Sequence, residues 1–190
     1  MKKRILFILL SLAGLSLPAA RAQESLPAGG PSFRILVMPT VGIGTESTLS
    51  YGVRLGCQFG SVHTAYVQWK SHFASQKAAF SCDKTGEVQG LATKPWYTGE
   101  KDKSRWSVTA GYGYSLLPWL SVYAGAGYGK RALYWATAEN RWAEVEPSTF
   151  SGLEMETGVM AFYKNFSVSV GAQTCMFKYS EITVGVGFLF

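Results

Sequence analysis

Apolar and polar residues alternate with a period of two along most of the chain. The alternation is clearest at the C-terminus, where every second residue from Ile182 to Phe190 is apolar. The residues between them, from Glu181 to Leu189, are mostly small or polar. This pattern indicates a β-strand with two unlike faces. In a soluble sandwich the apolar face would form the core, whereas in a membrane barrel it meets lipid and the small, polar face lines the lumen.

The same alternation predicts eight strands, at about 33–44, 49–60, 63–81, 89–116, 120–136, 142–162, 166–176 and 181–190. Very short connections follow the second, fourth and sixth strands, while a long polar segment follows the third. An even number of strands, with short turns at one end and longer loops at the other, is typical of single-chain outer-membrane barrels. The predicted fold is therefore an all-β, eight-stranded antiparallel up-and-down transmembrane β-barrel. A ten-stranded barrel is the alternative, but it would leave little chain for loops.

Two long hairpins are expected on the outer side, near 70–105 and 130–150. The first is predicted to continue the third and fourth strands to a tip near Lys84 to Glu87, and the second to turn near 138–141. The uncharged stretch 106–129 is long enough for a spanning helix, but Pro118 lies in its middle and would break one. This stretch is therefore interpreted as two strands joined by a tight turn.

The N-terminus has the features of a secretory signal. A cationic head, Met1 to Arg4, precedes an uncharged apolar run and the small-residue pair Ala20-x-Ala22. We expect Sec-type export with cleavage near Ala22, so that 1–22 is a signal peptide and 23–190 forms the barrel. A membrane anchor is disfavoured because the apolar run is too short to cross about 30 Å of hydrocarbon as a helix.

Charge and cysteine content exclude several functions. Four of the 18 basic residues lie in the expected signal, and against 12 acidic residues the rest of the chain has a net charge of only +2. Nucleic-acid binding is therefore not indicated. Cys57, Cys82 and Cys175 form neither a disulfide framework nor a metal-binding pattern, and no metal or other cofactor is predicted. The three are expected to lie too far apart to form a bridge.

The charges on the small, polar faces are expected to lie inside the barrel. Arg54, Lys70, Glu154 and Glu156 fall on these faces, and an Arg or Lys facing lipid at the midplane would cost about 2–4 kcal/mol. The second and sixth strands stand opposite each other in an eight-stranded ring, and the two side chains fall at similar heights. We therefore expect Arg54 to meet Glu156, or Glu154 one pleat higher, with Lys70 joining them. A side-chain plug is favoured over a gated pore because eight strands leave a bore just wide enough for side chains.

Two further patterns are given structural interpretations. The glycines of 125–129 lack the helix that a phosphate-binding loop requires, so they are expected to make room inside a narrow barrel. Apolar and aromatic side chains are expected to form lipid-facing belts. The members predicted for the periplasmic rim are Phe33, Phe59, Trp119, Phe166 and Phe188, and those for the outer rim are Trp69, Trp106 and Tyr134.

The last residues also carry a family resemblance. Thr183-x-Gly185-x-x-Phe188-x-Phe190 resembles the signal by which the barrel assembly machinery recognises its substrates. The whole segment 23–190 resembles the small eight-stranded outer-membrane barrels of the OmpA-barrel and OmpX type, and no part of it is expected to match the peptidoglycan-binding domain of full-length OmpA-like proteins. The resemblance implies the cell outer membrane of a Gram-negative bacterium, with outer-membrane lipid and the assembly machinery as partners. It names no surface ligand, since such barrels serve adhesion, envelope stabilisation and narrow pores.

The function expected from these observations is non-enzymatic, either structural or in surface interaction. The alternative is a narrow pore for small solutes. A lipid-modifying enzyme is the least favoured, because it needs a His, a Ser and an acid at the outer rim, facing lipid. Of the two histidines, His63 and His72, only His72 lies toward that rim, and by alternation it points inward.

Overall fold

The computed structural model describes residues 33–44, 48–72, 77–88 and 94–190. The expected signal peptide and the first residues after it lie outside these ranges. The strands are β1 (Phe33–Gly44), β2 (Leu49–Phe59), β3 (His63–Ser71), β4 (Phe80–Cys82), β5 (Tyr97–Leu117), β6 (Leu120–Thr137), β7 (Trp142–Val145), β8 (Phe150–Tyr163), β9 (Phe166–Cys175) and β10 (Tyr179–Leu189), with a 3-10 turn η1 (Glu146–Ser148) before β8. Within the described ranges, no helix is both long and apolar enough to cross a membrane.

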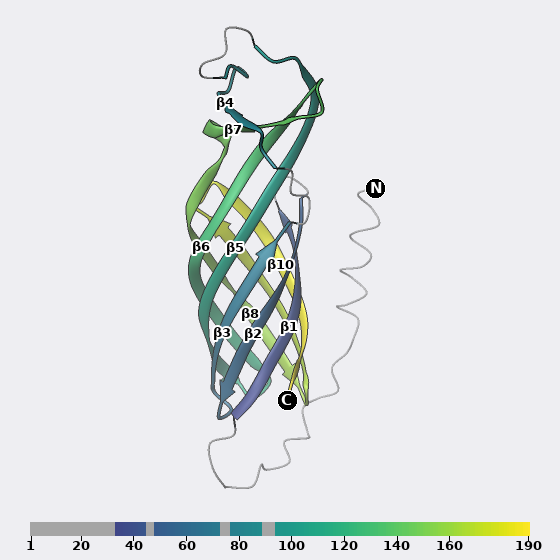
Figure 1. Ribbon diagram of the computed structural model, residues 1–190. Helices are drawn as coiled ribbons and strands as arrows, with labels where there is room; N and C mark the ends of the chain where they lie inside the picture. The colour runs from purple at the N-terminus through teal and green to yellow at the C-terminus, as the bar shows by residue number, and fades with distance from the viewer. Residues whose placement is uncertain (1–32, 45–47, 73–76, 89–93) are drawn as a thin grey trace, which may run out of the picture. The chain divides into compact units, whose positions relative to one another are not determined.

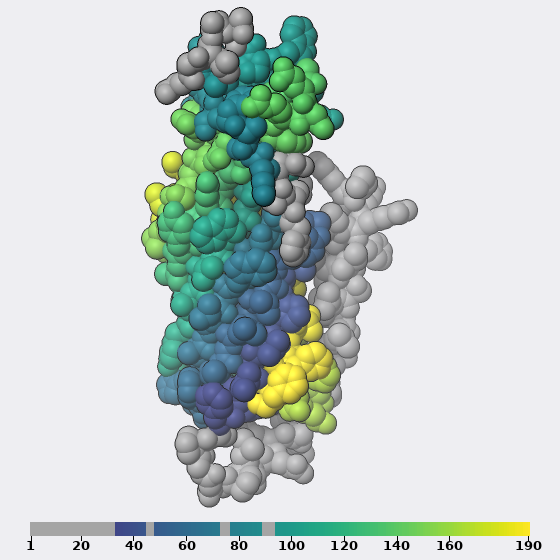
Figure 2. All heavy atoms as spheres, viewed as in Figure 1, coloured from purple at the N-terminus to yellow at the C-terminus, as the bar shows by residue number. Residues whose placement is uncertain are grey.

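Eight strands form a closed antiparallel ring in the order β1-β2-β3-β5-β6-β8-β9-β10 (Figure 1). The ring closes where β10 pairs with β1, and there Ile35 and Phe190 exchange two backbone hydrogen bonds of 2.9 Å. The first strand, purple in Figure 2, and the last, yellow, lie side by side in the wall. Closure leaves no exposed strand edge around the ring. The predicted eight-stranded antiparallel barrel is confirmed, and β4 and β7 are additional short strands outside the ring.

The connections at one end of the barrel are tight. β2–β3, β5–β6 and β8–β9 are joined there, at the end where β1 begins and β10 finishes (Figure 1). Gly60 and Lys164 adopt positive φ angles of 61° and 54° in two of these turns, which is the left-handed conformation that short hairpin turns require. We call this end the turn side and the opposite end the cap side.

Burial follows the predicted alternation. The side chains of Leu55 and Ile182 are 53% and 62% exposed on the outer wall, whereas Arg54 and Thr183 beside them are 0% and 2% exposed inside. Apolar residues thus cover the outside, and the buried charged residues lie inside, as in a membrane barrel. The inside also holds a cluster of apolar and aromatic side chains, Leu36, Met38, Tyr66, Tyr123, Met160 and Leu189. The predicted facing of the strands is confirmed.

Seven of the eight aromatic residues predicted for the two belts are exposed on the outer wall. Five of them lie on the turn side: Phe33, Phe59, Trp119, Phe166 and Phe188. The other two, Trp69 and Trp106, lie closer to the cap side. The prediction for Tyr134 is wrong, because its side chain is only 8% exposed. It lies beyond Arg131, where the pairing of β6 with β8 ends and pairing with β7 begins, so the lipid-facing pattern no longer applies.

The outer extensions differ from the prediction. The expected strand 63–81 ends at Ser71, and β4 pairs instead in parallel with β7. The expected strand 142–162 is divided by η1, which contains Pro147, a residue that lacks a backbone N–H. In place of a hairpin of the third and fourth predicted strands, β5 and β6 form the hairpin that rises above the ring (Figure 1). These two strands remain paired up to Tyr97 and Thr137. The predicted turn near 138–141 is confirmed, since the Thr137 N–H bonds to the Arg141 carbonyl oxygen at 2.8 Å.

These elements form a small structure that we call the outer cap: β4, β7, the turn 83–88, residues 94–104 and residues 132–137. The cap has its own apolar core. Cys82, Ala143 and Val145 are buried there, and Leu133 and Trp135 pack against them.

Candidate functional site

The candidate site is the polar interior of the barrel, whose charged side chains form two clusters. The turn-side cluster contains Arg54, Gln68, Thr109 and Glu156, together with the rings of Tyr66 and Tyr123. The cap-side cluster contains Lys70, Arg105, Glu154 and Glu181. Both sets come from alternate positions of their strands, because only every second side chain of a strand points inward.

Arg54 and Glu156 face each other in the turn-side cluster. Arg54 Nη2 lies 3.4 Å from Glu156 Oε2. Gln68 bridges the pair, since Arg54 Nε donates to Gln68 Oε1 at 2.9 Å and Gln68 Nε2 donates to Glu156 Oε2 at 2.8 Å. The Thr109 hydroxyl donates to the other Glu156 oxygen at 2.9 Å. The structure thus brings together the two residues that the sequence analysis placed opposite each other, and it adds a side-chain amide between them.

Two tyrosine rings enclose the Arg54 guanidinium. Its central carbon lies 4.6 Å from the ring centroid of Tyr66 and 4.2 Å from that of Tyr123, within the range of a cation–π interaction. Inward glycines make room for these rings. A Cβ added at Gly125 would lie 2.8 Å from the Tyr66 hydroxyl, and one added at Gly158 would lie 2.7 Å from the Tyr123 hydroxyl.

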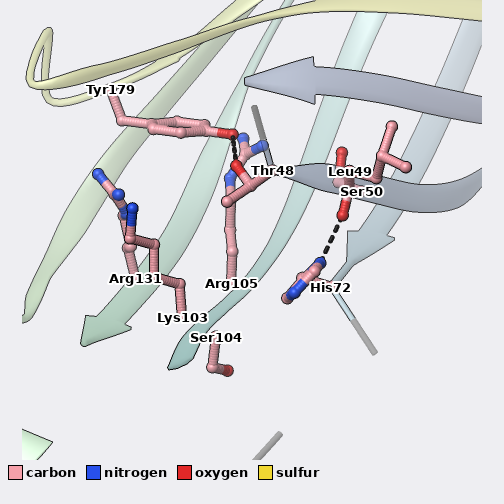
Figure 3. Close-up of a pocket in the computed structure, with 9 residues that line it drawn as sticks. All are labelled: Thr48, Leu49, Ser50, His72, Lys103, Ser104, Arg105, Arg131 and Tyr179. Carbon is pink, nitrogen blue, oxygen red and sulfur yellow. Dashed lines mark hydrogen bonds between the residues drawn. The ribbon is translucent and has the colours of Figure 1, made fainter. Parts of the chain in front are cut away.

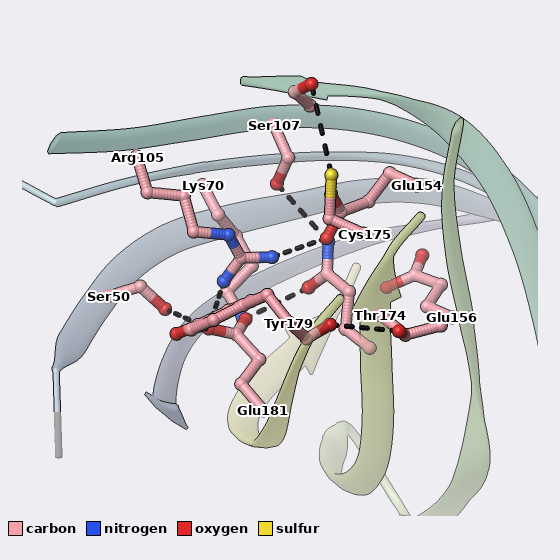
Figure 4. A network of polar contacts seen from close by, with 12 residues as sticks. Ser50, Lys70, Arg105, Ser107, Glu154, Glu156, Thr174, Cys175, Tyr179 and Glu181 are labelled. Atoms are coloured by element: carbon pink, nitrogen blue, oxygen red, sulfur yellow. Dashed lines mark hydrogen bonds and ion pairs between the residues drawn. The ribbon is translucent and has the colours of Figure 1, made fainter. Parts of the chain in front are cut away.

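Ion pairs in the cap-side cluster form a continuous network (Figure 4). Glu181 contacts both Lys70 and Arg105, and Arg105 also contacts Glu154. Lys70 Nζ donates further to Thr183 at 2.7 Å, and the Ser50 hydroxyl donates to Glu181 at 3.0 Å. The network therefore ties β2, β3, β5, β8 and β10 together across the bore.

The expectation that Lys70 joins Arg54 and Glu156 is wrong. In β3, Gln68 is the residue level with Arg54, and Lys70 lies one inward position closer to the cap side, level with Gly52. From there Lys70 reaches across the lumen to Glu181 of β10 instead. Glu154, offered as a second partner for Arg54, contacts Arg105.

Arg105 and Glu181 are the two members of the network that the sequence analysis missed. Arg105 lies in the mixed-charge segment assigned to an outer loop, but its spacing from Ser107 and Thr109, both inward, was a usable signal. Glu181 lies on the small, polar face of the last strand, and no partner had been assigned to it.

A small cavity marks the outer mouth of the lumen (Figure 3). Its volume is about 10 Å³, and Lys103, Arg105 and Arg131 are among the residues that line it, which leaves room for about one water molecule. The Tyr179 ring lies between Arg105 and Arg131, at 4.6 and 4.8 Å from their guanidinium carbons. Two guanidinium groups therefore lie against the same aromatic ring at this level.

The two histidines have no carboxylate partner among the described residues. His72 lines the mouth cavity and donates from Nδ1 to the Leu49 carbonyl oxygen, while His63 contacts the Tyr112 hydroxyl near the turn side. In the same part of the chain no group of three or more His, Cys, Asp or Glu side chains is placed to hold a metal. All three cysteines are free thiols.

Comparison with known proteins gives matches only at the level of structure. No protein-family model and no curated protein sequence matches the chain. Among solved structures, Ail, the attachment invasion locus protein of Yersinia pestis, is 13% identical, with a TM-score of 0.52, 84% of this chain covered and 97% of that chain covered. The N-terminal β-barrel domain of Pseudomonas aeruginosa OprF is 13% identical, with a TM-score of 0.51 and coverage of 85% and 100%. The chain has the fold of the small outer-membrane β-barrels.

A second Ail structure, a complex with the heparin analogue sucrose octasulfate, is 12% identical and has a TM-score of 0.55, with coverage of 84% of this chain and 97% of that chain.

The C-terminal motif lies in the last strand of the barrel, β10, and its final residue follows that strand. Thr183 points into the lumen, and Phe188 and Phe190 point outward. Gly185 lies on the inward face, where an added Cβ would lie 2.7 Å from the sulfur of Met38. The ring of Phe188 packs against Phe166 with 4.8 Å between centroids. The role of these four residues as an assembly signal stays a prediction.

Proposed function

We propose that this protein is an integral barrel of the bacterial outer membrane, inserted by the assembly machinery after export, with a closed bore and no enzymatic activity. Its role is structural or in surface interaction. The outer wall is apolar where lipid would contact it, the strands end in a motif resembling an assembly signal, and the fold is that of small outer-membrane barrels.

The observation that carries the closed-bore proposal is the buried ionic network. Arg54, Lys70 and Glu154 are all 1% exposed or less. A bore of eight strands is just wide enough for side chains, and here charged side chains joined to opposite walls occupy it. A solute would have to break several buried ion pairs to pass, each of which is costly to leave unpaired.

A surface-interaction role is supported by the outer cap. β5 and β6 continue past the ring, and the cap has an apolar core of its own (Figure 1). A packed structure beyond the wall is not needed to close the barrel, so it is suited to contacts outside the membrane. The heparin-analogue complex of Ail supports the idea that a barrel of this fold can present a ligand site.

Single-channel recording in planar lipid bilayers tests the closed bore against the narrow-pore alternative. We expect no reproducible conductance steps from the wild-type protein, with insertion verified separately by flotation of vesicles carrying it. Removing one cation from each cluster, by Arg54→Ala with Arg105→Ala, is expected to open a measurable conductance. The matched control is Lys130→Ala, which removes a cation whose partner is Glu144 in the cap. This variant is expected to show no conductance steps. Regular steps from the wild-type protein would establish a pore.

The lipid-modifying alternative has its own test. Overexpression is expected to leave the lipid A mass spectrum unchanged. A new lipid A species that disappears with His72→Ala would contradict the non-enzymatic proposal.

A further inference from the structure

The outer cap contains a cavity that the lumen network does not use. Its volume is about 250 Å³, and it is lined by Thr85, Lys94, Tyr97, Gly99, Glu100, Lys101 and Trp135. Every one of these residues belongs to the cap, and none is a member of the two charged clusters. The volume lies just below the range of about 300–1,000 Å³ that is common for ligand clefts, so a ligand of one ring is the appropriate size.

Two aromatic rings form preorganised walls. The rings of Tyr97 and Trp135 lie 5.5 Å apart between centroids and 80° apart in plane. Both pack against the cap core around Cys82, and the Tyr97 hydroxyl donates to the Gly86 carbonyl oxygen at 2.8 Å. Because the rings are already fixed, a ligand would not have to order them on binding.

The rim of the cavity is charged and open. Lys94, Glu100 and Lys101 are exposed, and together they give the lining one net positive charge. Lys101 Nζ lies 5.8 Å from the Trp135 ring centroid. At Gly99, φ is +89° and an added Cβ would meet nothing within 4 Å, so the wall is free of side chains at this point.

We propose that this cap pocket binds one sugar ring bearing a carboxylate, as in a uronic acid unit of a glycan. An apolar C–H face of the sugar ring lies on the indole of Trp135. The carboxylate is held by Lys94 or Lys101. Aromatic walls with a few polar groups around them are a common composition for small-molecule sites, and the net positive rim selects an acidic sugar over a neutral one.

The proposal uses the outer-membrane location only to conclude that the cap faces the cell exterior. Binding itself is measured on the purified protein in detergent micelles. A barrel that binds the sugar but is located elsewhere would refute the location alone, and a correctly located barrel that binds no sugar would refute the pocket alone.

The test follows the indole N–H signals by ¹H–¹⁵N NMR during titration with sodium glucuronate. The chain has six tryptophans, and Trp135→Phe identifies the Trp135 signal by deleting it. We expect that signal alone to shift, with a Kd on the order of 1 mM for a ligand of about 13 non-hydrogen atoms. Glucose, which lacks the carboxylate, is expected to bind roughly threefold more weakly.

Matched variants separate the pocket from the cap as a whole. Trp135→Phe keeps an aromatic ring but offers the sugar a smaller apolar face, and it is expected to weaken binding roughly threefold by calorimetry. Trp96→Phe is the control, because Trp96 lies in the same cap, is 81% exposed and does not line the cavity. Lys94→Met combined with Lys101→Met is expected to abolish the preference for glucuronate over glucose, while Lys84→Met, outside the lining, leaves it intact.

Three outcomes would overturn the proposal: no movement of the Trp135 signal, equal movement of several indole signals, or equal loss of binding in Trp96→Phe and Trp135→Phe. The source of the sugar is distinguished by repeating the titration in vesicles. If vesicles containing lipopolysaccharide with acidic core sugars weaken the response to free glucuronate and phospholipid vesicles do not, the glycan belongs to the same membrane. An equal response in both vesicles assigns it to a glycan outside the cell.

Discussion

Replacing Arg54 and Glu156 with alanine, singly and together, measures how strongly the two sides of the bore are coupled. Arg54→Ala removes the ion pair, the bond to Gln68 and the stacking between two tyrosine rings. Glu156→Ala leaves a fully buried guanidinium with Gln68 as its hydrogen-bonding partner and no counter-ion. Loss of one member of a buried ion pair costs about 3–5 kcal/mol, so each single variant should be strongly destabilised.

The geometry sets the size of the coupling. The Arg54–Glu156 distance of 3.4 Å is longer than the 2.7–2.9 Å of a strong charge-assisted hydrogen bond. Part of the interaction therefore passes through the two shorter bonds of Gln68. We expect a direct coupling energy of about 1–2 kcal/mol, within the range for contacting residues, and we expect Gln68→Ala to lower it.

The assay is equilibrium urea unfolding of the barrel in lipid vesicles, followed by tryptophan fluorescence. The double variant should lose about 1–2 kcal/mol less than the sum of the single variants. The matched control is the Lys130–Glu144 pair, 3.5 Å apart with a 42% exposed lysine side chain. An exposed pair of this kind should show a coupling of at most about 1 kcal/mol. Additivity of the Arg54 and Glu156 substitutions within about 0.5 kcal/mol would refute the reasoning.

Three further predictions concern Glu181, the turn at Asp83 and the cysteines. Glu181→Gln should lower the free energy of unfolding more than Glu156→Gln, measured in the same urea assay, because the Glu181 carboxylate faces two buried cations; an equal loss would contradict the network. Hydrogen bonds from the Thr85 hydroxyl and from backbone N–H groups hold the pKa of Asp83 below its ordinary value. The stabilisation of that turn should therefore be present above the ordinary Asp pKa and be lost as the pH falls through the lowered one, which an NMR pH titration of the Thr85 amide would follow. Thiol labelling of the folded barrel should modify Cys57 first, because the other two thiols are buried, and intact mass after unfolding should show three labels; fewer would indicate a disulfide.

The barrel fold could be predicted from the sequence because the alternation of apolar and polar residues is a local pattern. Alternation assigns each side chain to lipid or lumen without knowledge of any partner strand, and a one-residue error would have reversed every facing. The short connections fixed which strand ends meet at the turn side. With eight strands in a ring, the second and sixth stand opposite each other, and this was enough to place Arg54 against Glu156.

Which charges touch across the bore was decided only by the tertiary structure. Contacts across the lumen depend on the relative height of residues on strands distant in sequence, and the stagger of the ring sets these heights. Lys70 lies one inward position closer to the cap side than the level of Arg54, and its ion-pair partner is therefore Glu181. The parallel pairing of β4 with β7 was equally hidden, because it joins segments about 60 residues apart through three residues each. No period in the sequence records such a pairing, and for that reason the cap and its aromatic pocket emerged only from the folded chain.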